Sequence, residues 1–269
     1  QMMALVVVNG SGLPHEDELV ALLCQAVPEL KSVVINENRL PNNLILGANN
    51  RVLWGGPTIE DVLCGLKITL SPHSFYQVNS PQAEKLYRLG AKYAALDPGS
   101  TVLDLYCGAG AIGLSMAHLA GQVIGVEVVP QAVEDAKRNA VANGIDNARF
   151  LCADAAKAAQ QLAAEGIKPD VVLLDPPRKG CDEALLHTVA EDMAPSRVVY
   201  ISCDPATLAR DVALLKERGY TLKTAAAADL FPRCAHVETV VLLSRKTPDD
   251  TIEVDLDLDE LDITSAESK

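Results

Sequence analysis

The chain has 269 residues, of which 49% are hydrophobic, and a formal net charge of −13. This length and composition provide enough apolar surface for one large domain, or for one domain with a smaller companion. No apolar run approaches the ~18 residues of a membrane span, and no signal-peptide pattern is present, so we expect a cytoplasmic protein with no membrane partner.

The first part of the chain predicts a small α+β domain over residues 1–72. A strand is expected at Ala4–Asn9, a helix at His15–Ala26 and a second strand at Ser32–Asn36. Short strand-like runs follow near Leu44, Val52 and Ile68. The chain begins at Gln1, directly before a strand, which favours a fragment of a longer protein.

A second domain is predicted over residues 73–246, because apolar strand-like runs alternate regularly with helical stretches from Thr101 onward. Buried strands that alternate with helices indicate βαβ units and a parallel sheet. The last two strands have no helix between them and must therefore pair antiparallel. The expected strands are residues 101–107, 122–128, 148–154, 170–175, 197–203, 220–229 and 238–245, and the expected helices are residues 111–120, 130–143, 155–165, 182–193 and 205–218.

The acidic charge is concentrated behind these elements. Residues 249–269 contain nine acidic residues and one basic residue, which give −8, and the other 248 residues contain 27 acidic and 22 basic residues, which give −5. Residues 247–269 are therefore expected to form a disordered acidic tail. The charge of the remaining chain neither supports nor excludes an RNA partner.

The seven cysteines form no C-x-x-C pair, and their number is odd. This spacing argues against zinc, an iron–sulfur cluster or a secreted disulfide scaffold, so no metal is expected. Cys24, Cys64 and Cys152 are interpreted as small buried hydrophobic residues, and Cys107 as packing under a glycine loop.

A glycine pattern follows the first parallel strand. Gly108, Gly110 and Gly113 form G-x-G-x-x-G at the start of a helix, and Glu127 ends the next strand, where an acid can hold a ribose. This pattern alone fits an NAD-dependent oxidoreductase. Two further acids favour S-adenosylmethionine instead. Asp104, in the first strand, can neutralise a cationic ligand end, and Asp154, after the third strand, can face the adenine amine.

Reactive side chains are expected at the same edge of the sheet, where ligands of open α/β sheets bind. Asp175 follows the fourth strand, and Cys203 ends the fifth. The last strand is antiparallel, so its first residue, Glu238, reaches this edge too. Asp204 and Pro205 are suited to start a helix, whose N-terminus should favour the Cys203 thiolate.

Six segments carry a specific resemblance. In chain order they are "FYQVNSPQAEKLY", "LDLYCGAG", "GVEVVPQAVEDAKRNA", "LLDPPRKG", "VYISCDPATLARD" and "HVETVVLLSR". Together they resemble the S-adenosylmethionine-dependent RNA uracil-5-methyltransferases that act on 23S rRNA and tRNA, from about Leu66 to Arg245. The family's N-terminal TRAM domain is not found in this sequence, and no iron–sulfur cysteines are present to carry over.

The resemblance implies a Rossmann-like class I methyltransferase fold. Its sheet would have seven mostly parallel strands with the last one antiparallel. The small N-terminal α+β subdomain, residues 1–72, would be part of the family's central RNA-binding domain. It implies S-adenosylmethionine as cofactor and RNA as partner, with 23S rRNA expected ahead of tRNA, and no protein partner is inferred. Cys203 would be the nucleophile and Glu238 the base that removes the C5 proton. The cofactor would be bound by Gln77, Tyr106, Gly108, Gly110, Glu127, Asp154 and Asp175.

Three alternatives stay open at this point. A methyltransferase acting on an amino nitrogen would need an aromatic residue after the Asp-Pro-Pro sequence, and this chain has Arg178 there. The NAD-dependent oxidoreductase rests on the glycine pattern alone. The third alternative is a non-enzymatic RNA-binding module.

Overall fold

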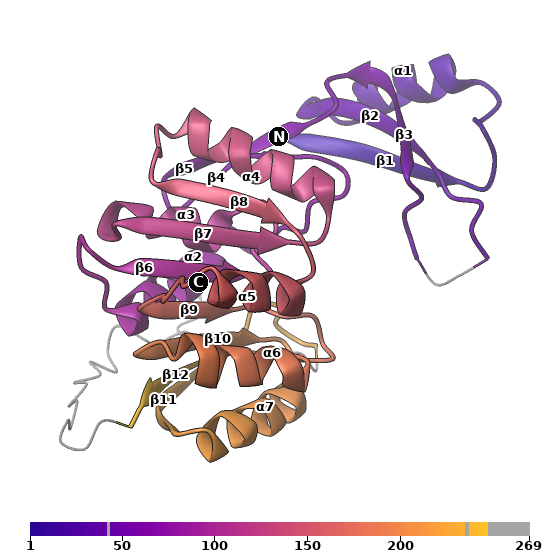
Figure 1. Cartoon of the computed structure of the whole chain (residues 1–269). Coiled ribbons are helices and arrows are strands. Elements are labelled where there is room, and N and C mark those ends of the chain that lie inside the picture. The colour runs from indigo at the N-terminus through magenta and orange to yellow at the C-terminus, as the bar shows by residue number, and fades with distance from the viewer. Residues whose placement is uncertain (42–43, 235–236, 247–269) are drawn as a thin grey trace. The chain divides into compact units, whose positions relative to one another are not determined.

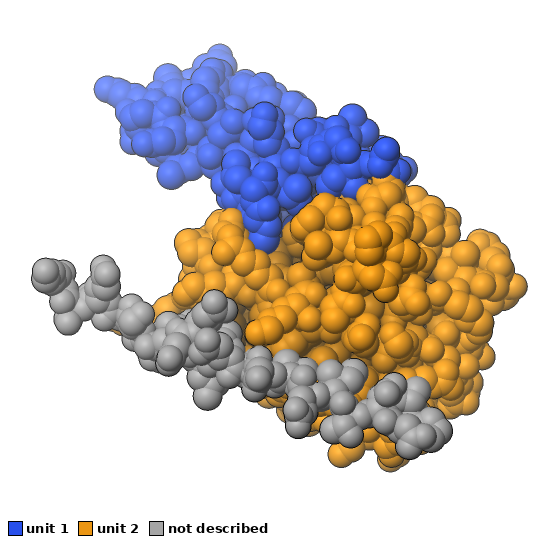
Figure 2. Space-filling view, turned by 90° about the vertical axis from the view of Figure 1, so that its left-hand side faces the viewer, with its two compact units in different colours: residues 1–76, 108–111, 129–146 blue, residues 77–107, 112–128, 147–269 orange. Residues whose placement is uncertain are grey.

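A computed structural model describes residues 1–41, 44–234 and 237–246 of the chain. These residues form two compact units, shown in different colours in Figure 2. Unit 1 comprises residues 1–76, 108–111 and 129–146, and unit 2 comprises residues 77–107, 112–128 and the described part of 147–269. The predicted domain boundary after residue 72 stays a prediction, and the predicted acidic tail at 247–269 lies outside the described residues.

A three-stranded sheet with one helix opens unit 1. The elements are β1 (Met2–Val8), α1 (Glu16–Ala26), β2 (Leu30–Glu37) and β3 (Asn49–Gly55). The central strand β2 pairs parallel with β1 and antiparallel with β3. The helix connects the two parallel strands, as the sequence predicted. A strand near Leu44 was also expected, and that prediction is wrong.

Side-chain hydrogen bonds account for the missing strand. Asn38 Nδ2 donates to the Leu44 carbonyl at 2.7 Å, and the Asn36 amide bonds both backbone groups of Gly47 at 2.8 and 2.7 Å. These asparagines take up backbone groups that a strand would pair with a neighbour. The apolar side chain of Leu44 is 61% exposed, so burial gives it no reason to join a sheet.

A hairpin completes the first part of unit 1. It is formed by β4 (Ile59–Leu63), which the sequence did not indicate, and β5 (Leu66–Leu70). Cys64 and Gly65 connect the strands with φ values of 53° and 77°, as a two-residue hairpin turn requires. Cys64 is therefore a half-buried turn residue rather than a buried hydrophobic one.

Helix α4 (Pro130–Ala142) also belongs to unit 1 and lies against β5. Asn139 is fully buried; its side-chain oxygen accepts from Thr69 N at 2.7 Å, and its Nδ2 donates to the Ala109 carbonyl at 3.0 Å. Asn139 thus provides hydrogen-bond partners for the backbone of the hairpin strand β5 and for the backbone of the glycine loop.

Unit 2 contains a seven-stranded sheet with the order β11-β12-β10-β9-β6-β7-β8, which can be followed in Figure 1. Strands β6 to β10 run parallel, and β12 is antiparallel to both β10 and β11. The predicted mostly parallel seven-stranded fold is confirmed. The strands are β6 (Thr101–Leu105), β7 (Gln122–Glu127), β8 (Ala148–Cys152), β9 (Val171–Leu174), β10 (Arg197–Ser202), β11 (Tyr220–Ala228) and β12 (Glu238–Arg245).

Helices pack on both faces of this sheet. Val198 and Tyr200 of β10 belong to a buried cluster with α5, α6, η2 and α7. Val199 points to the opposite face, because side chains alternate along a strand, and there it lies 3.9 Å from the position of a Cβ on Gly90 of α2. The helices are α2 (Ser80–Ala94), α3 (Ala111–Ser115), η1 (Ala117–Leu119), α5 (Ala155–Ala164), α6 (Glu183–His187), η2 (Thr188–Met193) and α7 (Pro205–Glu217).

Two of the predicted helices are shorter or less regular than expected. The stretch 111–120 is an α-helix only to Ser115 and continues as the 3₁₀ turn η1. The stretch 182–193 changes after His187 into the π-helix η2. Among the described residues, no helix combines the length and apolarity that a membrane span needs.

Candidate active site

The carboxyl ends of the parallel strands in unit 2 place several predicted site residues at one edge of the sheet. Leu105 pairs with Val126 and with Leu174, so Tyr106, Glu127 and Asp175 follow at the same level on three neighbouring strands. This alignment is what a parallel sheet imposes, and it is the edge where the sequence predicted ligand binding.

Cys203 and Glu238 meet through an antiparallel pairing. Ser202 of β10 pairs with Thr239 of β12, so continuing the register by one residue brings Cys203 opposite Glu238. Cys203 is half-buried, whereas Glu238 is buried with 6% of its surface exposed. The structure therefore brings the predicted nucleophile and the predicted base together.

Three carboxyl groups at or near this edge have raised pKa values. Burial, followed by the nearby charges of Glu238 and Asp104, raises the pKa of Asp175 to about 8. Burial likewise raises the pKa of Asp104 to about 7, and it raises the pKa of Glu238, while the charge of Arg178 opposes the shift at Glu238. The surroundings thus stabilise the protonated form of a carboxyl beside the thiol. They disfavour the charged carboxylate, which is the form that a base at this site needs.

The pKa of Cys203 departs from the sequence expectation. Burial raises it, the charges of Glu238 and Asp175 raise it further, and Arg178 lowers it. The prediction that the helix N-terminus would make this thiol acidic is therefore wrong in direction. Two carboxyl groups and partial burial outweigh the helix N-terminus, whose effect is small and local.

Replacing Asp175 with Asn should stabilise the protein more at about pH 8.5 than at about pH 5. The Asp175 pKa rises from its ordinary value of 3.8 to about 8 on folding. Between these values the native state binds more protons than the unfolded state, so its stability falls as pH rises through that window. Asn has no proton to lose and escapes this penalty.

Urea unfolding at the two pH values measures the difference in the free energy of unfolding. The exposed residue Asp146 provides the control, since Asp146→Asn should have the same effect at both pH values. An Asp175→Asn variant with equal effects at the two pH values would contradict the raised pKa.

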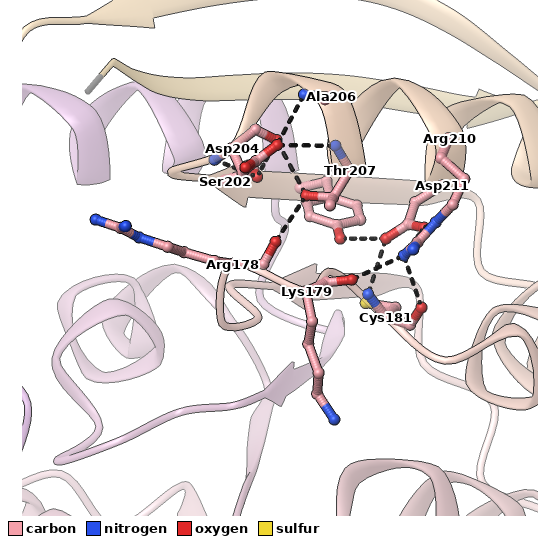
Figure 3. A network of polar contacts seen from close by, with 10 residues as sticks. Arg178, Lys179, Cys181, Ser202, Asp204, Ala206, Thr207, Arg210 and Asp211 are labelled. Carbon is pink, nitrogen blue, oxygen red and sulfur yellow. Dashed lines mark hydrogen bonds and ion pairs between the residues drawn. The ribbon is translucent and has the colours of Figure 1, made fainter. Parts of the chain in front are cut away.

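The helix start after Cys203 is built as the sequence predicted. Asp204 is the N-cap of α7, and its Oδ1 accepts from Ala206 N at 2.9 Å and from Thr207 N at 3.0 Å. Ser202 Oγ in turn accepts from Asp204 N at 3.1 Å. Figure 3 shows these bonds at the first turn of α7. They fix the backbone on both sides of Cys203.

The glycine pattern is explained by backbone geometry and close packing. Gly108 and Gly110 have φ values of 54° and 83°, which favour glycine. Gly113 donates its backbone N–H to Asp104 Oδ2 at 3.0 Å. A Cβ at Gly113 would lie 2.8 Å from that oxygen and 3.0 Å from Val123 Cγ1, so a side chain at this position would disturb the core.

Two buried polar atoms in unit 2 provide a test of the predicted cofactor site. Asp104 is 1% exposed and Gln77 is 5% exposed. Asp104 Oδ1 and Gln77 Oε1 have no hydrogen-bond partner among the described residues. A buried acceptor without a partner is costly, and an N–H donor of a ligand would satisfy such an atom. The residues present therefore fit the cationic amino-acid end of S-adenosylmethionine.

The other predicted cofactor residues differ in their surroundings. Glu127 is half-buried at the end of β7, and Tyr106 follows β6 with a φ of 70°. The Tyr106 hydroxyl bonds the buried thiol of Cys181, and burial raises the Tyr106 pKa. Asp154 is exposed and caps α5, accepting from Lys157 N at 3.1 Å. Its carboxylate thus has a structural role that the sequence did not predict.

The cysteines outside the site differ in burial from what was expected. Cys107 is buried, as predicted, but Cys152 is exposed and Cys24 is half-buried. Among the residues that the structure describes, no group of three or more His, Cys, Asp or Glu side chains is arranged to hold a metal ion.

The sequence missed a polar network beside the site, in which the buried Asp211 bonds the buried Tyr200 and Cys181 and the exposed Arg210. Arg210 pairs with Asp211, Nη2 to Oδ1 at 2.7 Å. A signal for the network was present, because Asp211 lies at helical spacing with the apolar residues Leu208, Val212 and Leu215.

A family comparison matches most of the chain. The sequence model described as tRNA (Uracil-5-)-methyltransferase matches residues 66–246. An uncharacterised RNA methyltransferase from Clostridium acetobutylicum is 44% identical over 245 residues, which are 91% of this chain and 53% of that protein. Another from Staphylococcus aureus is 46% identical over 246 residues, which are 91% and 54%. The chain therefore spans about half the length of these curated relatives.

A solved structure supports the same relationship. The tRNA (uracil-54, C5)-methyltransferase of Pyrococcus abyssi, in complex with S-adenosyl-L-homocysteine, is 31% identical and has a TM-score of 0.71. The similarity covers 90% of this chain and 56% of that one. The strand order, the segments quoted from the sequence and these similarities agree, and the chain therefore belongs to the tRNA (uracil-5-)-methyltransferase family.

Proposed function

We propose that the protein transfers a methyl group from S-adenosylmethionine to C5 of a uridine in RNA. The observation that carries this proposal is the strand register that sets Cys203 opposite Glu238. A nucleophile and a base on adjacent strands, beside cofactor-type carboxylates, are what C5 methylation of uracil requires. Family membership and the Pyrococcus abyssi relative support RNA methylation and the S-adenosylmethionine cofactor predicted from the sequence.

The cofactor would be held by residues with distinct tasks. Asp104 and Gln77 offer the buried acceptors for the cationic end, and Glu127 is placed to accept from a ribose diol. Tyr106 and Asp175 follow their strands at the same level. Gly108 and Gly110, directly after β6 in the chain, offer backbone without side chains, and Asp154 stays proposed for the adenine amine.

The chemistry explains why a thiol and a carboxylate are both needed. S-adenosylmethionine, when bound, supplies the methyl group as a sulfonium electrophile. Uracil C5 is too weak a nucleophile to attack it directly. The Cys203 thiolate adds to C6 and makes C5 an enolate carbon that can take the methyl group. The Glu238 carboxylate then accepts the C5 proton as the Cys203–C6 bond breaks, which restores the uracil ring and the thiolate.

The uracil must leave its stack for this reaction, because the thiolate attacks from a ring face. We propose 23S rRNA as substrate ahead of tRNA, and the cytoplasm as location. The Pyrococcus abyssi relative is named for tRNA, so both RNAs belong in the test.

The test incubates the purified chain with methyl-labelled S-adenosylmethionine and either a 23S rRNA or a tRNA transcript. Nucleoside mass spectrometry should find 5-methyluridine in the rRNA. Label in the tRNA alone would support C5 methylation but identify tRNA, not 23S rRNA, as the substrate. Label on an exocyclic nitrogen would favour the amino-methyltransferase alternative. RNA binding without any transfer, in a chain that spans half of its relatives, would favour the binding-module alternative.

A further inference from the structure

A fully buried carboxylate, Asp211, lies at the centre of a polar network beside the site (Figure 3). Its Oδ2 accepts from the Tyr200 hydroxyl at 2.6 Å and from Cys181 N at 2.8 Å. Its Oδ1 accepts from Arg210 Nε at 2.8 Å. Such a buried charge needs every one of these partners, and removing one leaves it uncompensated.

The network fastens one loop onto α7. We call residues 175–181, which follow β9, the Pro-Pro loop. Arg210 Nη2 donates to the carbonyls of Lys179 at 3.0 Å and Cys181 at 3.2 Å. Thr207 Oγ1 donates to the Arg178 carbonyl at 3.1 Å. Three residues of α7 thus hold backbone groups at three positions of the Pro-Pro loop.

The loop fits the helix so closely that it needs a glycine. Gly180 has a φ of 75°. A Cβ at this position would lie 2.6 Å from Arg210 Nη2 and 2.6 Å from Asp211 Oδ2. A larger residue would therefore clash with the groups that hold the loop, so the docking geometry is specific rather than a chance surface contact.

The Pro-Pro loop carries a charge that acts on both reactive groups. The Arg178 side chain extends away from the clamped backbone in Figure 3. Its positive charge lowers the pKa of Cys203 and opposes the upward shift at Glu238. In the described part of the chain, the other titratable groups that act on or adjoin Cys203 are carboxyls, namely Glu238 of β12, Asp175 after β9 and the N-cap Asp204. Among the described residues, Arg178 is thus a cation that offsets the charges of Glu238 and Asp175 at Cys203.

We propose that Asp211, Arg210 and Thr207 are positioning residues that dock the Pro-Pro loop on α7 and so hold the Arg178 guanidinium beside Cys203 and Glu238. The helix that begins directly after the nucleophile also fixes the loop that supplies its counter-charge. The meaning of this clamp for catalysis rests on the proposed function, but its effect on the thiol can be measured without RNA or cofactor.

The experiment measures the pH dependence of Cys203 alkylation by iodoacetamide in the purified chain, with the Cys203 peptide quantified by mass spectrometry. Arg178→Gln should raise the apparent pKa of the thiol by about half a unit or more, because a nearby cation is lost. Lys179→Gln, at the exposed neighbouring position, is the matched control and should leave the titration unchanged.

The positioning variants should give the same shift through Arg178. Asp211→Asn and Thr207→Val are expected to raise the thiol pKa, and Thr207→Ser, which keeps the hydroxyl, should restore it. In an Arg178→Gln background the first two should add little, because they act on a charge already removed. Thermal unfolding monitored by circular dichroism shows which variants are folded. If Asp211→Asn does not fold, Thr207→Val tests the clamp in its place.

A folded Thr207→Val variant with the wild-type titration would overturn the positioning role. An unchanged titration in Arg178→Gln would overturn the role of the cation. If the shifts occur in a chain that transfers no methyl group, the proposed function fails and the clamp stands. If methyl transfer occurs without the shifts, the clamp fails and the proposed function stands.

Discussion

Cys203→Ala is expected to reduce methyl transfer to uridine C5 by a factor on the order of 10⁴ or more, and to abolish any covalent RNA adduct. Without the thiolate no bond forms at C6, and C5 stays too weak a nucleophile to take the methyl group. The loss should appear in the rate of transfer at saturating cofactor and RNA rather than in their binding, because no other contact is removed.

The variant should fold, which makes the test clean. Cys203 is half-buried, and the bonds that shape its surroundings come from Ser202 and Asp204 rather than from its own thiol. Cys152→Ala is the matched control, because Cys152 is exposed at the end of β8. That variant should retain full transfer.

Label incorporation into RNA measures the rate, and a denaturing gel reveals the adduct. Retention of C5 methylation by Cys203→Ala would show that the covalent mechanism is wrong. Loss of transfer in Cys152→Ala as well would indicate that general damage, not a missing nucleophile, explains the effect.

The fold could be predicted because its strongest signals are local. Buried runs such as 197–203 and 238–245 are long and apolar enough to fix strands, and the absence of a helix between the last two strands fixes their antiparallel pairing. Family segments at the strand ends then predict the candidate site. What the sequence could not supply was the balance of interactions between residues far apart in the chain.

Helix α2 was not predicted, although the sequence contains a local signal for its start. Asn79 caps it, accepting from Gln82 N at 3.4 Å, and Pro81 lies in its first turn. These residues indicate a helix start, yet the first helix expected in the second domain began only at residue 111.

The direction of the Cys203 pKa shift could not be predicted, because it depends on residues that are distant in the sequence. The helix start after it is visible in the sequence, but Glu238 follows 35 positions later and reaches the thiol only through strand pairing. Burial and the summed effect of two carboxyls decide the direction of the shift. The same holds for Asp211, whose partner Cys181 precedes it by 30 positions. Such pairings become visible only when the sheet is formed.

Glu238→Gln should stall the reaction after methyl transfer and accumulate an adduct between Cys203 and C6 of the methylated uracil. Gln has the same shape and fits the buried position at the start of β12, but its amide cannot accept the C5 proton. Elimination of the thiolate depends on that proton transfer. Nucleophilic addition and methyl transfer need no base at C5, so they should proceed.

Mass spectrometry of the Cys203 peptide should then show an attached methylated nucleotide, and a denaturing gel should show protein bound to RNA. Glu217→Gln, at an exposed position near the end of α7, is the matched control and should release free 5-methyluridine as the wild type does. Adding Cys203→Ala to Glu238→Gln should remove the adduct, which would identify the sulfur that forms it.

The pH dependence gives an independent check on Glu238. Burial raises its pKa, so in the wild type the fraction of carboxylate, and with it the rate of adduct breakdown, should increase as pH rises through that raised value. In Glu238→Gln this increase should be absent, since the amide does not titrate. Release of 5-methyluridine by Glu238→Gln at the wild-type rate, without an adduct, would assign proton removal to another group, and Asp175, whose pKa is about 8, would be the next residue to replace.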